Sequence, residues 1–142
     1  MGSVRRLRFV SRPFKKGKMA KMEIAADELA ELLQGCYSEY ISGLAILDIR
    51  SRRAFRKGSI VGSVNIQAPR ELDGFVSPCT DLPQVFVFCG DRSPRKSMSF
   101  AAQFRDSLLE RGAEGRVFYL EGGLGGFFAE YPEHCTGQYA DD

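Results

Sequence analysis

Residues 85–88, Val-Phe-Val-Phe, form a compact apolar run that is followed directly by loop-forming residues. Such a run, half of it β-branched, is typical of a strand buried on both faces, and the Gly, Asp, Ser and Pro within 90–94 indicate a tight loop. From Lys96 onward, apolar residues recur at helical spacing until Gly112. The chain therefore contains a strand, a loop and a helix in succession, and Cys89 stands where the strand ends.

Other apolar runs extend this pattern along the chain. They predict strands at 22–24, 44–47, 60–66 and 116–120 and a helix at 27–33. Alternating strands and helices predict an α/β domain with a mostly parallel, five-stranded sheet and helices on both faces. Sites in such sheets form at the carboxyl ends of the strands. We therefore expect Asp48, Cys89 and Glu121, which each follow a strand, near one edge.

Three segments carry weaker patterns. Residues 51–57 are a short polar stretch, 70–83 show no readable period, and 124–131 indicate a short apolar turn that ends near Pro132.

Residues 1–22 contain eight Lys and Arg side chains and no acid. Because apolar periodicity is also absent there, we expect a mobile basic tail at 1–22 and a folded domain at 23–142. Two further interpretations stay open, an organelle-targeting peptide or an arm that docks on an acidic protein partner or membrane surface. The net charge of +2 indicates no nucleic-acid partner. With no membrane-spanning run and no secretory signal, an intracellular, cytoplasmic or nuclear protein is expected.

The cysteines do not follow a metal-binding pattern. The four of them are widely spaced, and the chain has a single histidine, His134, so we predict no metal site and free thiols. The four are Cys36, Cys79, Cys89 and Cys135. Only Cys89 has a loop arranged around it. Since this loop opens onto a helix N-terminus, its free N–H groups and the helix dipole favour an anion and a lowered thiol pKa.

Two signatures in the sequence resemble those of rhodanese-like domains. Asp48-x-Arg50 is followed by Phe55 and by Gly-x-Ile-x-Gly-Ser-x-Asn over 58–65, as in the first family signature. Tyr-Leu-Glu-Gly-Gly at 119–123 and the aromatic turn that follows it are similar to the second family signature. The resemblance spans about residues 24–135. Ala54 and Ser59 depart from the family, which usually has Glu and His at these positions.

The aromatic ending at 127–132 resembles that of rhodanese-fold phosphatases of the cell-division-cycle type and of eukaryotic arsenate reductases. That resemblance implies a loop of Cys, five residues and Arg, which Cys89 and Arg95 match. It implies that Cys89 is the nucleophile and Arg95 the oxyanion clamp. The supporting N–H donors would be those of Gly90, Asp91, Arg92 and Ser93. A phosphoprotein or small oxyanion would be the substrate, with no cofactor beyond an external thiol for arsenate reduction.

Features of the loop keep two alternatives open. Pro94 lacks an N–H, the Asp91 carboxylate would repel an anion unless it turns onto Arg92, and Phe88 stands where the phosphatases usually have His. If Arg92 instead ends the loop, as in Gly-Asn-Arg-Ser of sulfurtransferases, the loop is too short to cradle an anion. The domain would then be an inactive protein-binding module of the kinase-docking type. A thiosulfate-type sulfurtransferase, carrying a persulfide on Cys89, is the other alternative.

Overall fold

A five-stranded sheet forms the centre of the molecule in the computed structural model, which describes residues 22–76, 82–113 and 115–141. All its neighbouring strands are parallel. In spatial order the strands are β1 (Glu23–Ile24), β6 (Gly115–Leu120), β5 (Gln84–Cys89), β2 (Gly43–Asp48) and β4 (Val64–Asn65). The predicted α/β class and the five-stranded parallel sheet are therefore confirmed.

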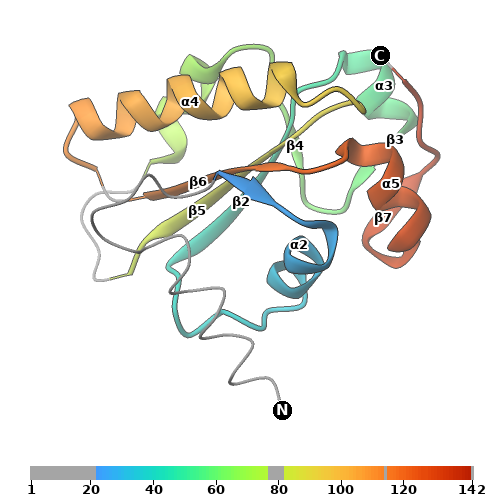
Figure 1. Cartoon of the computed structure of the whole chain (residues 1–142), viewed down its shortest axis with the longest axis horizontal. Helices are drawn as coiled ribbons and strands as arrows, with labels where there is room; N and C mark the ends of the chain where they lie inside the picture. Colours follow the sequence, from blue (N-terminus) through green and yellow to red (C-terminus); the bar gives the residue numbers. More distant parts are fainter. Residues whose placement is uncertain (1–21, 77–81, 114, 142) are drawn as a thin grey trace.

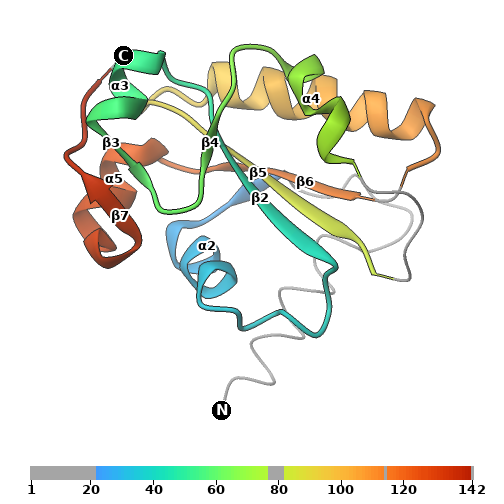
Figure 2. The ribbon, with the colours of Figure 1, turned by 180° about the vertical axis from the view of Figure 1, so that it is seen from behind.

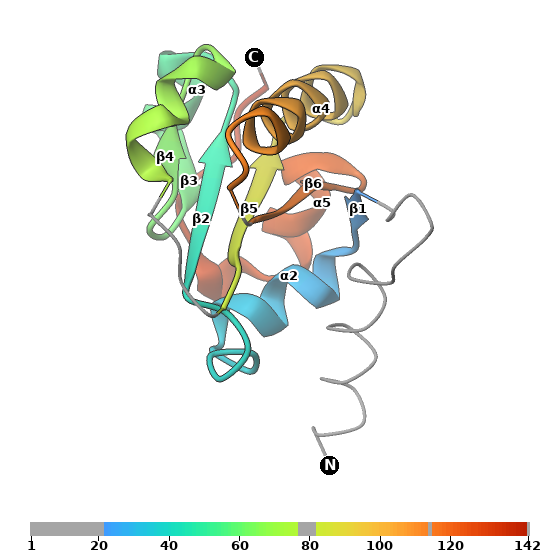
Figure 3. The same ribbon diagram turned by 90° about the vertical axis from the view of Figure 1, so that its left-hand side faces the viewer.

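Helical segments cover both faces of this sheet (Figures 1 and 3). Helix α4 and the 3₁₀ segment η1 lie on one face, and α2 and α5 lie on the other. Their bounds are α2 (Ala26–Leu33), η1 (Pro69–Phe75), α4 (Arg95–Glu110) and α5 (Gly123–Glu130). Two short elements complete the helices, α3 (Arg52–Lys57) and the 3₁₀ turn η2 (Pro132–His134).

Side chains of β5 alternate between the two layers of the core. Phe86 and Phe88 pack edge-on against Phe104 of α4, with ring centroids 4.8 and 6.0 Å apart. Val87 and Cys89 belong to the apolar cluster on the opposite face, under α2 and α5. Both faces of β5 are buried, which explains why its sequence is a continuous apolar run. The predicted burial of this strand on both faces is confirmed.

Two segments differ from the expectations. The polar stretch 51–57 contains helix α3, whose N-cap Ser51 accepts a hydrogen bond from the Ala54 N–H at 3.2 Å. Only Ala54 of this helix is buried, so no apolar stripe marks it in the sequence. The expected strand at 60–66 is split into β3 (Gly58–Ile60) and β4, which belong to different sheets. A turn at residues 60–63 separates them, where Ser63 N–H and Oγ both donate to the Ile60 carbonyl.

A final strand, β7 (Cys135–Gly137), pairs antiparallel with β3 in a second, two-stranded sheet (Figure 2). Its sequence gives no strand signal, because only three residues take part. This pairing carries the end of the chain back to the carboxyl ends of the central strands. The basic tail and Cys79 lie outside the described residues, apart from Met22. No helix in the described part of the chain has the length and apolarity needed to cross a membrane.

Candidate functional site

Strands β2 and β5 end side by side, with Asp48 and Cys89 paired in register. The sequence therefore predicts this edge correctly for these two residues. Glu121 follows the next strand, β6, but its side chain is exposed and does not line the cavity described below.

Asp48 and Arg50 form a buried ion pair beneath this edge. The two side chains are 1% and 0% exposed, and Arg50 Nη2 and Nε lie 2.7 and 3.1 Å from the two Asp48 carboxylate oxygens. Arg50 also donates to the carbonyls of Gly58 at 2.7 Å and Ala140 at 2.9 Å. The pair therefore ties β2 to β3 and to the C-terminal segment.

Above the pair lies an open cavity of about 180 Å³. It is lined by Ile49, Arg50, Gly90, Asp91, Ser93, Arg95 and Lys96. Arg95 is the first residue of α4, and within the described residues no backbone or side-chain acceptor is found for the amides of 91–93 and 95–97. The cavity thus combines an exposed guanidinium with the free amides of a loop and a helix start.

Lys96 supplies a second cation that the sequence analysis did not assign to the site. Its Nζ donates to the Ile49 carbonyl at 3.0 Å and lies 5.7 Å from the centre of the Phe100 ring. These contacts hold the ammonium at the cavity wall. The sequence could have indicated that Lys96 belongs to the site, because Lys96 directly follows Arg95 in the first turn of the helix.

The Cys89 thiol lies below the cavity, within the apolar core. Cys89 is 0% exposed and is not a lining residue, and its Sγ is 3.9 Å from the Val87 carbonyl. Burial, and then the Asp48 carboxylate, raise the pKa of the Cys89 thiol well above its ordinary value, while Arg50 acts in the opposite direction. The structure therefore brings Gly90, Asp91, Ser93 and Arg95 together, while the Cys89 thiol and the exposed Arg92 lie outside the cavity.

The start of α5 holds the loop in place. The Leu124 N–H donates to the Gly90 carbonyl at 2.8 Å. Gly123 has φ +75°, and a Cβ there would lie 2.3 Å from the Asp91 carbonyl oxygen. Only glycine fits this close approach, so the loop requires a glycine at position 123.

Asp91 turns toward Tyr139 in the C-terminal segment, rather than onto Arg92. The Tyr139 hydroxyl donates toward Asp91 Oδ1 at 3.2 Å and Asp141 Oδ1 at 2.7 Å. Its ring centre lies 5.5 Å from the Arg50 guanidinium carbon. Burial, and then these acids, raise the pKa of Tyr139, so the hydroxyl keeps its proton and remains a donor. No local sequence pattern predicts this long-range contact.

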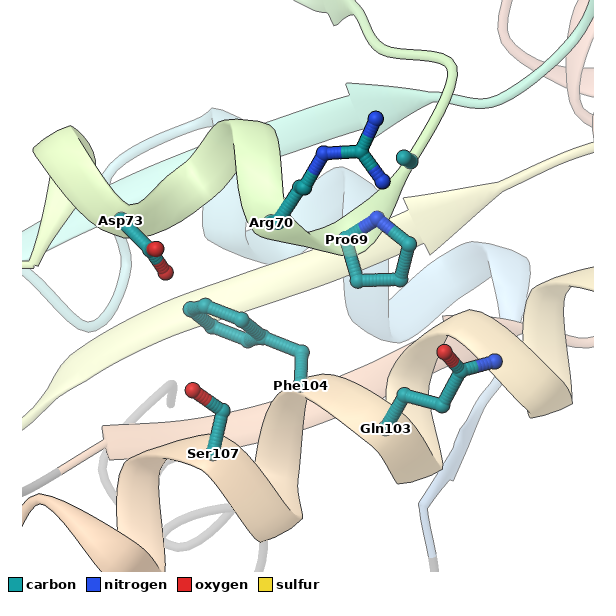
Figure 4. Close-up of a pocket in the computed structure, with 7 residues that line it drawn as sticks. Pro69, Arg70, Asp73, Gln103, Phe104 and Ser107 are labelled. Atoms are coloured by element: carbon teal, nitrogen blue, oxygen red, sulfur yellow. The ribbon is translucent and has the colours of Figure 1, made fainter.

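A second cavity, of about 260 Å³, lies between η1 and α4 (Figure 4). Side chains of α4 form one wall and side chains of η1 form the other; the lining residues are Ala68, Pro69, Arg70, Asp73, Gln103, Phe104 and Ser107. None of them comes from the loop between Cys89 and Arg95. No cluster of potential metal ligands is found among the residues that the structure describes.

The burial of Cys89 has a direct chemical consequence. At pH 8, iodoacetamide is expected to modify the half-buried Cys36 readily and to leave Cys89 unmodified until the protein unfolds, because the thiolate is the reactive form. Burial, and then Glu133, raise the pKa of Cys135 to about 11, so its modification should be slow at pH 8 and accelerate toward that pH. Peptide mapping by mass spectrometry would measure each rate. Equal rates for Cys89 and Cys36 in the native protein would contradict this prediction.

Comparison with known proteins identifies several that are similar to this chain. A model of the rhodanese-like domain matches residues 25–130. M-phase inducer phosphatase 3 of Mus musculus is 30% identical over 127 residues, which cover 81% of this chain but only 28% of the phosphatase. The chain therefore spans less than a third of the length of this curated relative.

Solved structures agree on the fold. The As–Sb reductase of Leishmania major superposes with a TM-score of 0.63 and 22% identity, covering 84% of this chain and 88% of the reductase chain. A thiosulfate sulfurtransferase from Pseudomonas aeruginosa gives a TM-score of 0.53 and 19% identity, covering 85% of this chain and 21% of that chain. At such identities these likenesses show the shared fold alone.

Proposed function

The chain belongs to the rhodanese-like domain family, and we propose on that premise that it binds a phosphate- or arsenate-type oxyanion in the cavity beside Arg95. The observation that carries this proposal is the lining itself. Arg95 and Lys96 line one open cavity at the start of α4, together with Asp91 and Ser93, whose amides lack an internal acceptor. A planar guanidinium and successive N–H groups are the donors that tetrahedral oxyanions require.

The Asp91 carboxylate lines the cavity and opposes anion binding, and its contact with Tyr139 reduces this effect. A carboxylate in this cavity would repel a phosphate, but Asp91 accepts a hydrogen bond from Tyr139, whose ring packs beside Arg50. Of the loop's two arginines, Arg95 lines the cavity and Arg92 does not, which favours Arg95 as the clamp.

Binding and catalysis are separate steps in this site, because the Cys89 thiol does not line the cavity. The second candidate is therefore a cysteine-dependent phosphatase or arsenate reductase, which the spacing from Cys89 to Arg95 and the similarity to the mouse phosphatase favour. For phosphatase turnover, the Cys89 thiolate would bond to phosphorus as the alcohol leaves, and water would then release phosphate. This step requires the thiol to move into the cavity.

The first experiment measures oxyanion binding by isothermal titration calorimetry with inorganic phosphate and arsenate. We expect Arg95→Ala to weaken binding by about tenfold or more, because a charge-assisted hydrogen bond contributes about 1.5–3 kcal/mol. Arg105→Ala, which removes the same charge from the middle of α4, is the matched control and should bind as wild type. Equal binding by the Arg95 variant would overturn the proposal.

The second experiment separates the two candidates through turnover. Wild type and Cys89→Ser are compared for hydrolysis of an aryl phosphate and, with glutathione, for arsenate reduction. Turnover that is lost in Cys89→Ser establishes the enzyme, whereas phosphate binding without turnover in either protein leaves recognition as the function.

A further inference from the structure

Helix α3 presents a dense basic face. Four of its six residues are Arg52, Arg53, Arg56 and Lys57, and all four side chains are exposed. Residues 52 and 56, like 53 and 57, are neighbours one turn apart, so the four charges share one side of the helix. Ala54 is buried on the other side.

This face is unfavourable for the helix itself. Like charges at i and i+4 repel, and Arg52 and Arg53 in the first turn oppose the helix dipole, although Arg56 and Lys57 in the last turn complement it. Among residues 22–76, 82–113 and 115–141, none of the four cations has an ion-pair partner. Neighbouring cations that repel one another without a facing acid are typical of a binding surface.

The basic face lies next to the oxyanion cavity. Ser51, the N-cap of α3, directly follows the cavity residue Arg50, and the Gln138 N–H donates to the Lys57 carbonyl at 2.9 Å. Figures 1 and 2 show α3 and the start of α4 at the same end of the sheet. The four cations of α3 therefore extend the positive charge of Arg95 and Lys96 along one edge of the molecule.

We propose, building on the proposed oxyanion site, that α3 binds the acidic side chains of a polypeptide whose phosphorylated residue occupies the cavity. The ligand is then a phosphorylated, acidic protein segment rather than a free anion. An extended peptide advances about 3.3 Å per residue and α3 is about 9 Å long, so about three residues of such a peptide would lie along the helix. Complementary charge favours this ligand. The cavity can bind one phosphate, and the four cations of α3 can bind several carboxylates beside it.

Fluorescence anisotropy of labelled peptides tests this assignment on the full chain carrying Cys89→Ser, which keeps the phosphate attached. Two phosphoserine peptides are compared, one flanked by Glu on both sides and one flanked by Ser. We expect the acidic peptide to bind about tenfold more tightly. Replacing all four α3 cations by Gln should abolish that advantage, since exposed ion pairs are individually weak and add up.

Charge-matched variants isolate the contribution of α3. Arg52→Gln with Arg56→Gln removes two cations from the face, whereas Arg105→Gln with Arg111→Gln removes one from α4 and one from its C-cap, away from the start of the helix. Only the first pair should weaken binding of the acidic peptide, and binding of inorganic phosphate should change by less than about twofold in both. Thermal unfolding of the α3 variants should be unchanged or slightly raised, because repulsion within the helix is relieved.

The possible outcomes distinguish the two proposals. If Arg95→Ala leaves binding of both peptides intact, the oxyanion site itself fails. If both peptides need Arg95 but bind equally well with and without the α3 cations, only the assignment of α3 is overturned. Anionic lipid vesicles and single-stranded DNA are titrated at the same salt concentration. If the α3 variant weakens their binding as much as that of the acidic peptide, α3 is a general polyanion surface and the proposal fails.

Discussion

Arg50→Ala is expected to destabilise the domain by about 3–5 kcal/mol, because it leaves the Asp48 carboxylate buried without its counter-ion. The Gly58 and Ala140 carbonyls lose their donor in the same variant. Urea denaturation followed by circular dichroism would measure this loss as a lower midpoint with an unchanged slope.

An exposed pair provides the control for this prediction. Arg111 and Asp73 lie 3.5 Å apart with side chains 38% and 60% exposed, so Arg111→Ala should cost less than about 1 kcal/mol. The double variant Asp48→Leu with Arg50→Met should recover part of the stability, since it removes both buried charges. It should not recover all of it, because the two carbonyls remain without a donor. A loss below about 1 kcal/mol in Arg50→Ala would show that the pair is not buried in solution.

The features that the sequence predicts well are those encoded by neighbouring residues. Continuous apolar runs identify buried parallel strands, because both faces of β5 and β2 are covered. The loop is likewise predicted by its Gly, Asp, Ser and Pro residues, and α4 begins within one residue of the expected Lys96. Val85, Val87 and Cys89 alternate along β5 and therefore face the same layer of the core.

The features that the sequence does not predict depend on distant contacts. Asp91 and Tyr139 are 48 residues apart, and their hydrogen bond forms only because β7 returns the chain to the edge of the central sheet. Helix α3 is not predicted from the sequence because most of its residues are basic. Its single buried residue, an alanine, produces no apolar periodicity. These two features determine the charge around the cavity, so its lining could not be derived from the loop residues alone.

Gly123→Ala is expected to displace the loop and to destabilise the domain more than Gly122→Ala. Both glycines have positive φ, +75° and +79°, which costs an alanine about 1–2 kcal/mol. A Cβ at Gly122 meets nothing within 4 Å, whereas one at Gly123 would lie 2.3 Å from the Asp91 carbonyl oxygen. The backbone clash should add about 1–3 kcal/mol to the loss in Gly123→Ala. Denaturation midpoints of the two variants measure this difference.

The same pair of variants tests how the loop depends on α5. The bond from the Leu124 N–H to the Gly90 carbonyl fixes the residues that line the cavity, so Gly123→Ala should weaken phosphate binding by tenfold or more. Gly122→Ala should bind phosphate as wild type once its stability is taken into account, because it leaves that contact untouched. Equal phosphate affinities in the two variants would mean that the contact with α5 does not hold the loop in its binding conformation.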